Sequence, residues 1–342
     1  MATTGEDNMP PKPQPPLNLP SLVATAFSRA VASKDVNFYP TSVTLINVNS
    51  IPFQLRYSPS LANKPKPPAP LPVVPPSPPN ASHPPPPKKT FFNPFASPAQ
   101  AMLITPLGSP PSHNLVLNKF AIVPEHFILS TAAFKPQTHL LEADDLAAAY
   151  ACIEEYAQHG QELFVFFNSG EHSGASQPHR HLQLLPVGNM KEGLLGGEWD
   201  VLAKRLSTPE TKRKLPFEVF AAGIEEVNGD GEGLRKVYLE LYSQACEAVL
   251  GVAEDIKLDG EAKMSYNLAM TRTTMVVMPR LAEGGVVKDE KGQEVGKLAL
   301  NGTVLAGTAL VKSEMEWNAL RRDPAQVREV LGRIGVPNRA KI

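Results

Sequence analysis

Residues 162–186, ELFVFFNSGEHSGASQPHRHLQLLP, contain two runs of strand length separated by a loop. The apolar run 162–167 predicts a buried strand, and residues 178–186 predict a second strand. Residues 168–177, between the two runs, are rich in glycine, serine and other turn-forming types. This stretch therefore predicts strand, loop and strand, and it contains most of the side chains that can perform chemistry.

One face of the second predicted strand carries two imidazoles and an amide. Successive side chains of a strand point to opposite faces, so His179, His181 and Gln183 project together and their neighbours project the other way. The preceding residues 173–177 (SGASQ) offer backbone N–H groups and hydroxyls, which is the composition of a nest for phosphate oxygens. An oxyanion cradle beside two histidines indicates phosphorus chemistry.

The His-x-His pair has three interpretations: zinc ligation, two unremarkable strand histidines, or nucleophilic catalysis. No third Cys, His or carboxylate lies at a metal-motif spacing, and Gln183 is an indifferent zinc ligand. A histidine with the reference pKa of about 6.5 is largely neutral at pH 7, so one ring nitrogen is already a competent nucleophile. The context favours catalysis over a metal, and we predict no metal site.

Composition limits the class of protein. Hydrophobic residues make up 42% of the 342 residues, and 33 basic residues against 34 acidic ones give no electrostatic bias toward nucleic acid or membrane. Two cysteines are too few for a disulfide framework, and we find neither a signal peptide nor an apolar run long enough to span a membrane. We expect a soluble protein of the cytoplasm, with the nucleus as a second location.

Proline divides the chain. Residues 65–87 contain 13 prolines in 23 positions, which predicts extended chain that serves as a spacer or as a docking segment for a proline-reading domain. We expect a disordered N-terminus over 1–20, a catalytic half over 21–190 that includes this segment, and a substrate-binding half over 191–342. All eight histidines lie at or before His181, so imidazole chemistry belongs to the first half.

Periodicity predicts a mixture of helices and strands. Helices are expected at residues 21–33, 142–158, 198–206 and 233–251. Strands are expected at 43–46, 53–56, 115–120, 121–129, 264–278 and 296–312, and an exposed hairpin or loop at 284–296. Residues 113–124 resemble residues 266–279, which indicates either a duplicated strand pair or coincidence.

The stretch NSG, loop, SGASQPHRHLQ resembles the active-site signature of the histidine-triad superfamily in its transferase branch. The likeness is greatest to the fungal-type diadenosine tetraphosphate phosphorylases, also called ATP adenylyltransferases. Further blocks resemble this family in order, at residues 53–56, 61–65, 113–131, 265–267 and 300–312. The resemblance implies an α+β fold, a histidine-triad-like antiparallel sheet with flanking helices, in which two similar halves form one unit.

The resemblance also implies a reaction. His181 attacks the α-phosphorus of diadenosine tetraphosphate and expels ATP, and inorganic phosphate then releases the adenylyl group from His181 as ADP, in a reversible sequence. Similarity to galactose-1-phosphate uridylyltransferase, which has the same His-x-His-x-Gln order, supports His181 as the nucleophile. Triad hydrolases have a third histidine where this chain has Gln183, and an amide cannot transfer a proton near neutral pH. We therefore expect the adenylyl-histidine intermediate to react with phosphate and not with water.

The resemblance assigns further roles residue by residue. Asn168 orients His181 or the α-phosphate, Gln183 contacts a non-bridging oxygen, and His179 holds the strand and the ring of His181. Substrate contacts are expected from Lys64, Asn118, Lys119, Ser173, Gly174, Ala175, Ser176, Asn301, Gly302, Thr303, Thr308 and Lys312. Two places depart from the family pattern, because Thr308 replaces a usual methionine and Gly302-Thr303 replaces a usual small apolar pair.

No tightly bound cofactor is expected, and a divalent cation such as Mg²⁺ would arrive with the polyphosphate. The expected ligands are diadenosine polyphosphates, ATP, ADP and phosphate. One alternative is a hydrolase or nucleotidyltransferase that acts on adenylyl sulfate or a nucleotide sugar. Another is a catalytically silent nucleotide-binding scaffold. Taken alone, lysines at strand ends such as Lys64 and Lys312 are usually solvated surface residues, and Asn118 in an apolar strand could instead satisfy a buried backbone group.

Overall fold

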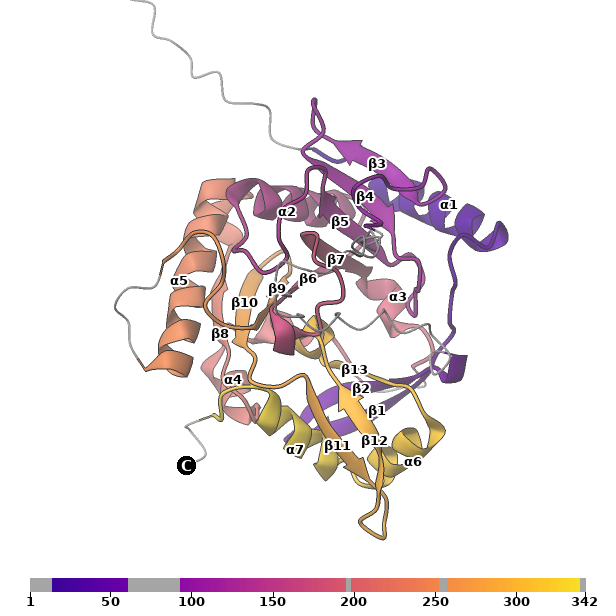
Figure 1. Ribbon diagram of the computed structural model, residues 1–342, viewed down its shortest axis with the longest axis vertical. Helices are drawn as coiled ribbons and strands as arrows, with labels where there is room; N and C mark the ends of the chain where they lie inside the picture. Colours follow the sequence, from indigo (N-terminus) through magenta and orange to yellow (C-terminus); the bar gives the residue numbers. More distant parts are fainter. Residues whose placement is uncertain (1–13, 61–92, 195–197, 252–256, 339–342) are drawn as a thin grey trace, which may run out of the picture.

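The computed structural model describes residues 14–60, 93–194, 198–251 and 257–338, and the predicted strand–loop–strand lies at the centre of its largest sheet. This sheet is antiparallel, with eight strands in the order β3-β4-β5-β7-β6-β9-β10-β8 (Figure 1). Its strands are β3 (Leu103–Leu107), β4 (His113–Leu117), β5 (Phe127–Thr131), β6 (Leu163–Ser169), β7 (His181–Pro186), β8 (Phe220–Gly223), β9 (Tyr266–Met270) and β10 (Thr274–Pro279).

Strand β6 shows why the sheet is central. All seven of its residues are buried, and successive side chains enter two different cores. Phe164 and Phe166 pack into the first core, whereas Val165 and Phe167 pack into the second. A strand covered on both faces needs apolar residues at every position, which is what the ELFVFF run supplies.

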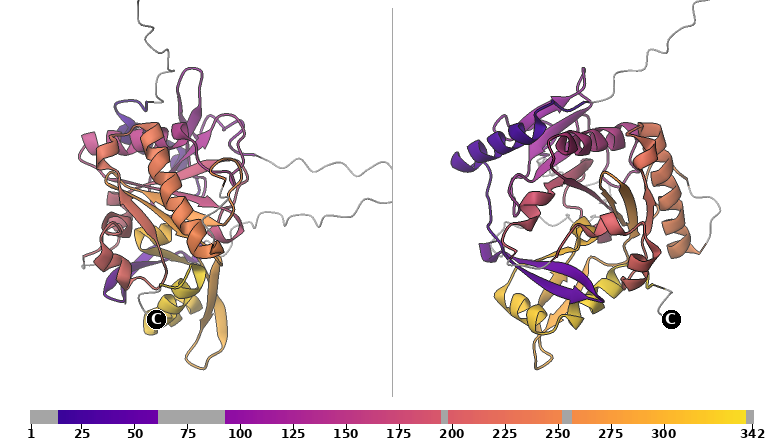
Figure 2. Two further views of the ribbon diagram at one scale, coloured as in Figure 1. Left: turned by 90° about the vertical axis from the view of Figure 1, so that its left-hand side faces the viewer. Right: turned by 180° about the vertical axis from the view of Figure 1, so that it is seen from behind.

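Two long helices cover one face, which we call the helix face. They are α2 (Ala143–Gln158) and α5 (Gly231–Leu250), and they pack with β6, β9 and β10 around the second core (Figure 2). Helix α2 begins with a capping box in which Glu142 and Asp145 satisfy each other's backbone N–H groups. Helix α1 (Leu19–Ala32) lies at the edge of the same core through Leu19 and Val23.

A smaller layer covers the opposite face, which we call the site face. It contains the sheet β1-β2-β13, in which β13 pairs parallel to β2, and the hairpin β11-β12. These strands are β1 (Ser42–Val48), β2 (Ile51–Tyr57), β11 (Gly284–Lys288), β12 (Glu294–Ala299) and β13 (Thr308–Val311). The helical elements grouped with them are α3 (Val187–Lys191), α4 (Pro209–Lys214), α6 (Glu314–Arg322), α7 (Ala325–Ile334), and the 3-10 turns η3 (Leu202–Arg205) and η5 (Gly302–Ala306). Segments from the N-terminal and C-terminal parts of the chain therefore meet over the site face.

The α+β class and most predicted elements are confirmed. Helices at 142–158 and 233–251, strands at 43–46 and 53–56, and the hairpin at 284–296 all appear close to their expected limits. Helix α1 begins at Leu19, inside the range 1–20 that we expected to be disordered, with Pro20 in its first turn. Residues 1–13 and 65–87 lie outside the described residues. None of the described helices combines the length and apolar character that crossing a bilayer requires.

Four expectations need correction. The predicted helix 198–206 is reduced to η3, because Asp200 accepts from the backbone N–H of Val201 and the Trp199 indole donates to the carbonyl of Gly307. The predicted strand 121–129 begins only at Phe127, since residues 121–126 form a turn. The predicted strand 178–186 begins at His181, and the predicted strand 296–312 is interrupted by η5.

The internal echo does not correspond to two equivalent hairpins. Residues 266–279 form the hairpin β9-β10, whereas β4 pairs with β5 and residues 122–124 lie in the turn between them. Residues 103–186 supply five strands of the large sheet and residues 220–279 supply three. The two halves therefore join edge to edge through β6 and β9 and contribute unequally to one sheet.

Candidate active site

His181 is the first residue of β7, and its ring is fixed by one hydrogen bond. Its Nδ1 lies 2.9 Å from the backbone carbonyl of His179, which can only accept, so Nδ1 carries the proton. The described residues include no hydrogen-bond partner for Nε2, which is left with its lone pair. Burial lowers the pKa of His181 to about 4, and the bond to the His179 carbonyl opposes this only in part. The ring is therefore a neutral base at pH 7.

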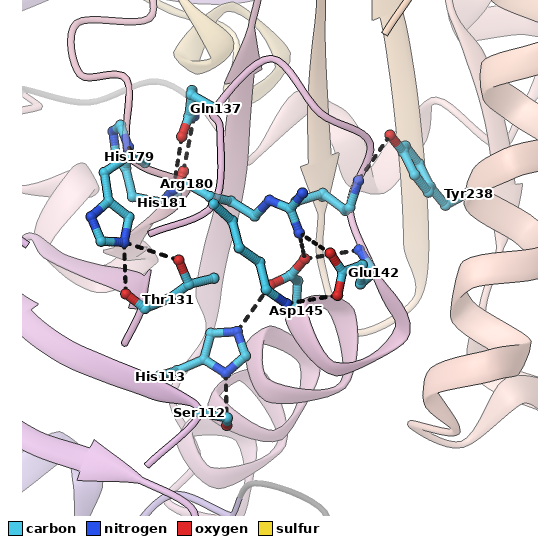
Figure 3. A network of polar contacts seen from close by, with 12 residues as sticks. Ser112, His113, Thr131, Gln137, Glu142, Asp145, His179, Arg180, His181 and Tyr238 are labelled. Carbon is cyan, nitrogen blue, oxygen red and sulfur yellow. Dashed lines mark hydrogen bonds and ion pairs between the residues drawn. The ribbon is translucent and has the colours of Figure 1, made fainter. Parts of the chain in front are cut away.

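His179 lies just before β7, in an isolated bridge to Pro136, and its ring is also held on both sides. Its Nε2 donates to the carbonyl of Thr131 at 2.8 Å (Figure 3). Its Nδ1 is 2.9 Å from the amide nitrogen of Asn93. Burial lowers the pKa of His179 as well. Both ring nitrogens are engaged, so His179 offers a backbone carbonyl to His181 and no free nitrogen to a substrate.

Aromatic rings enclose the two histidines. The ring of Phe95 is 5.0 Å from the ring of His181 and 5.8 Å from that of His179, and Phe95 is itself buried. Phe134 contacts the ring of His179 at 5.3 Å and is exposed to solvent. These apolar neighbours explain why burial dominates the pKa of both imidazoles.

Gln137 joins the strand that carries His181 to the strand that carries Asn168. Its Oε1 accepts from the backbone N–H of His181 at 2.7 Å, and its Nε2 donates to the Asn168 carbonyl at 2.8 Å and to the His181 carbonyl at 3.1 Å. Sequence reasoning missed this residue, because it lies in a loop with no motif around it. It fixes the separation of β6 and β7 where the candidate nucleophile lies.

Arg180 points away from the site, into the helix face. Its Nη1 contacts Asp145 at 2.7 Å and Glu142 at 2.9 Å, and His113 approaches Asp145 from the other side at 3.0 Å (Figure 3). Burial alone would raise the pKa of Asp145, but the His113 hydrogen bond and the Arg180 charge hold it below its usual range. The strand that carries the histidines is therefore anchored to the first turn of α2.

Asn168, at the end of β6, is buried and connects three segments. Its Oδ1 accepts from the Asn267 amide and from the backbone N–H of Gly302, both at 2.8 Å. The same Asn267 amide donates to the carbonyl of Ser173 at 3.0 Å. The β6 strand, the glycine-serine loop and the C-terminal segment at residue 302 therefore meet at two side-chain amides, of which Asn267 was noted only as part of a family block.

The loop after β6 is held in one shape by its own groups. The buried Ser173 hydroxyl donates to the Gly170 carbonyl at 2.7 Å and accepts from the N–H of Ala175 at 3.2 Å, so it is turned into the loop. Gly174 has φ of +81°, and a Cβ there would lie 2.7 Å from the Cβ of Asn301. Beyond Gly174, the residues 175–176 are exposed. They face solvent, as does Glu171 earlier in the loop.

The C-terminal segment 301–308 packs against the same strands. Asn301 caps η5 by accepting from the N–H and hydroxyl of Thr303 at 3.0 and 2.8 Å. A Cβ at Gly302 would lie 2.6 Å from Phe166, so no larger residue fits there. The Thr308 hydroxyl donates to Gln54 at 3.1 Å. The structure thus explains Gly302, one of the departures from the family pattern, as a close approach of backbone to β6.

The remaining predicted contacts lie farther from His181 or outside the described residues. Asn118 follows β4, where its Oδ1 accepts from the N–H of Phe120 at 2.9 Å, and Lys119 beside it is exposed. The register of β4, β5 and β7 places the end of β4 two strands from β7, level with Leu184, which is three residues along β7 from His181. The sideways and lengthwise displacements are each about 10 Å, so the end of β4 lies roughly 14 Å from His181.

Three predicted side chains remain to be placed. Gln183 lies on the same face as His181, opposite Phe166 and Ile128, and is partly exposed. Lys312 is exposed after β13, and Lys64 lies outside the described residues. Within the described ranges, no group of three or more His, Cys, Asp or Glu side chains could hold a metal ion.

Two family models match this chain, one after the other. The model of the Ap4A phosphorylase N-terminal domain matches residues 10–194, and that of the ATP adenylyltransferase C-terminal domain matches residues 213–337. Protein APA1 of Saccharomyces cerevisiae is 26% identical over 337 residues, which is 94% of this chain and 96% of that protein. Diadenosine 5',5'''-P1,P4-tetraphosphate phosphorylase 2 of the same yeast is 30% identical over 262 residues, covering 72% of this chain and 77% of that protein.

Solved structures resemble the whole chain. The crystal structure of yeast Ap4A phosphorylase Apa2 matches with a TM-score of 0.72 and 22% identity, over 96% of this chain and 99% of that chain. The structure of Apa2 in complex with Ap4A matches with a TM-score of 0.71 and 23% identity, over 96% and 99% of the two chains. The shared fold includes the large sheet and the layer over its site face.

Proposed function

The chain belongs to the Ap4A phosphorylase family, and from this premise we infer that it cleaves diadenosine tetraphosphate with inorganic phosphate to give ATP and ADP. The observation that carries the chemistry is the ring of His181. Its proton is held on Nδ1 by the His179 carbonyl, and its Nε2 has no hydrogen-bond partner among the described residues. A neutral imidazole needs no separate base to attack phosphorus.

In the first step, Nε2 of His181 attacks the α-phosphorus of the substrate. An N–P bond forms, the bond from the α-phosphorus to its bridging oxygen breaks, and ATP leaves with that oxygen. The Nδ1 proton stays in place, so the adenylylated ring becomes a cation. The His179 carbonyl, 2.9 Å away, carries partial negative charge and stabilises this cation.

In the second step, an oxygen of inorganic phosphate attacks the same phosphorus from the other side and the N–P bond breaks. ADP leaves, and Nε2 regains its lone pair. Phosphate already carries negative oxygens, whereas water would have to lose a proton as it attacks. Gln183, the next residue on this face, cannot accept that proton. We therefore expect phosphate to be used in preference to water.

The surrounding groups would bind the polyphosphate. The exposed residues 175–176, with the backbone N–H groups of Gly174 and Ser176, would form the oxyanion cradle, and the expected cations are Lys64, Lys119 and Lys312. Asn118 follows the end of β4, roughly 14 Å from His181, and a nucleoside attached to the α-phosphate would have to extend across β5 to reach it. A magnesium ion would accompany the polyphosphate and offset its charge.

Product analysis tests this function. Purified full-length protein is incubated with diadenosine tetraphosphate, with and without inorganic phosphate, and the nucleotides are separated. ATP and ADP that appear only with phosphate support phosphorolysis. AMP and ATP without phosphate would show a hydrolase. Absence of turnover, together with turnover of adenylyl sulfate or a nucleotide sugar, would identify a different substrate.

A further inference from the structure

Arg280 is a buried cation on the site face. It follows β10, it is 2% exposed, and its Nη1 donates to the side-chain carbonyl of Asn267. Its Nη2 donates to three backbone carbonyls, at 2.9–3.0 Å. These belong to Ala282, Glu283 and Leu300. All the acceptors are neutral, so the hydrogen bonds orient the guanidinium without cancelling its charge.

The described residues supply no direct counter-charge. Across residues 14–60, 93–194, 198–251 and 257–338, no carboxylate forms an ion pair with Arg280. The carboxylate of Glu283 acts on it only through space, and that group is bound to Lys297 at 3.2 Å at the surface. Burial lowers the pKa of Arg280 to about 10, which leaves it charged at pH 7. Buried charges in proteins are normally paired, so this one calls for a partner.

The position of Arg280 identifies that partner. The Asn267 amide that receives Arg280 donates in turn to Asn168 and to the carbonyl of Ser173, at the base of the glycine-serine loop. The Leu300 carbonyl that receives Arg280 precedes the segment where Gly302 donates to Asn168. The guanidinium therefore lies behind the segment at residues 300–302 and behind the glycine-serine loop, and the proposed function gives this loop to the phosphates.

Arg180 provides the contrast within the same sheet. It is equally buried, but it forms ion pairs with Asp145 and Glu142 on the helix face. The chain therefore neutralises Arg180 with carboxylates on the helix face, whereas Arg280 on the site face, like the buried Arg56 of β2, forms no ion pair with a carboxylate of the described residues. A substrate that carries about four negative charges is attracted to a site that contains an uncompensated cation.

We propose that Arg280 is a positioning residue whose missing counter-charge is the polyphosphate chain of the substrate. It acts from behind the loop by adding one positive charge to the field at the phosphates, and its hydrogen bonds to Asn267 and to the Leu300 carbonyl hold that charge in place. This rests on the proposed function for the location of the phosphates. The consequence is selectivity for the anionic chain over the nucleoside: Arg280 strengthens binding of phosphate groups and leaves adenosine binding unchanged.

Equilibrium binding of two probes, inorganic tripolyphosphate and adenosine, tests this with the full-length protein. The variants are R280M, which removes the charge, and R280K, which keeps the charge but loses the planar fork. The control is R272M, which removes an exposed arginine from the turn at the other end of the same β9-β10 hairpin. The attraction between two unit charges about 8 Å apart, at an effective dielectric constant near 20, increases binding affinity by roughly thirtyfold.

We expect R280M to weaken tripolyphosphate binding by about tenfold to thirtyfold, with adenosine within about twofold of wild type. R280K should stay within about threefold for both probes, as should R272M. Equal losses for both probes in R280M, or equal losses in R280K and R280M, would overturn the proposal and leave Arg280 as a structural tether. If R280M does not fold, R280K decides alone, because a tenfold loss with the charge retained contradicts an electrostatic role.

The binding assay also separates this inference from the proposed function. Wild-type protein that binds tripolyphosphate through Arg280 but does not cleave diadenosine tetraphosphate would contradict the function and support the anion site. Protein that performs phosphorolysis with R280M binding both probes like wild type would support the function and contradict the role of Arg280.

Discussion

The two faces of the large sheet treat buried charge in opposite ways. On the helix face, Arg180 lies against Asp145 and Glu142, with His113 completing the network, so the charges are matched within the protein. On the site face, neutral imidazoles, amides and Arg280, which has no ion pair among the described residues, surround the end of β6 and the start of β7. The first arrangement stabilises the fold without a ligand. The second is completed only by an anion, which is the property of a site for phosphate groups.

The largest expected effect is the loss of activity when a histidine of the site face is replaced by alanine, compared with the same replacement on the helix face. His181→Ala removes the nucleophile, so formation of the adenylyl-enzyme from diadenosine tetraphosphate should fall by at least about 10⁴-fold. His113→Ala leaves the nucleophile but removes one partner of Asp145, so it should lower the free energy of unfolding by about 1–3 kcal/mol. The variant should keep its activity at low temperature, where it remains folded. Intact-protein mass spectrometry without phosphate measures the first, and urea unfolding measures the second. Adenylylation of the His181→Ala protein would show that the nucleophile is another residue.

Removing a carboxylate from the helix face should mainly affect stability. Asp145→Asn leaves the buried guanidinium of Arg180 with Glu142, which is half exposed, as its remaining partner. Breaking a buried ion pair on one side costs about 3–5 kcal/mol, and urea unfolding should show a loss of this size. The double variant Arg180→Met with Asp145→Leu removes both charges and should recover most of it. A loss below about 1 kcal/mol in Asp145→Asn would mean that the network does not anchor the strand.

Adding a carboxylate to the site face should do the reverse. In Asn168→Asp, an Oδ atom still accepts from Asn267 and Gly302, and the new negative charge lies one side chain from Arg280. We expect unchanged or higher stability, together with a loss of about tenfold to a hundredfold in kcat/KM for diadenosine tetraphosphate, because the carboxylate repels the phosphates. Steady-state kinetics and thermal unfolding of the same preparation measure both. Lower stability with unchanged kcat/KM would contradict the contrast between the faces.

Local patterns in the sequence predicted much of this arrangement. The alternation of β7 separates His181 and Gln183 from Arg180, and the all-apolar β6 predicts a strand buried on both faces. Helix α2 and its acidic first turn were also evident from residues 142–158. Each of these features is determined by residues that are close together in the sequence.

The remaining features depend on contacts between distant segments. Gln137 reaches His181 across 44 positions, and Asn168 reaches Gly302 across 134. Whether Arg180 or Arg280 forms an ion pair depends on which carboxylates the fold brings near. The amino-acid composition gives the number of charged residues but not which of them form ion pairs. The helix predicted at 198–206 failed for the same reason, because Trp199 is held by the distant carbonyl of Gly307.

The smallest expected effect is the change in the rate of adenylylation at acidic pH. Because burial on the site face lowers the pKa of His181 to about 4, its neutral form persists until the pH falls through that value, and only below it is the nucleophile lost to protonation. The rate of adenylylation in a single turnover without phosphate should therefore change by less than about twofold between pH 8 and pH 5.5, where a histidine with the ordinary pKa of about 6.5 would lose roughly tenfold. Rapid-quench measurement of released ATP tests this, with far-UV circular dichroism at each pH as the control for folding. A tenfold decline at pH 5.5 in folded protein would mean that the imidazole is solvated in the working enzyme, so that the site face does not hold its base in the neutral form by burial.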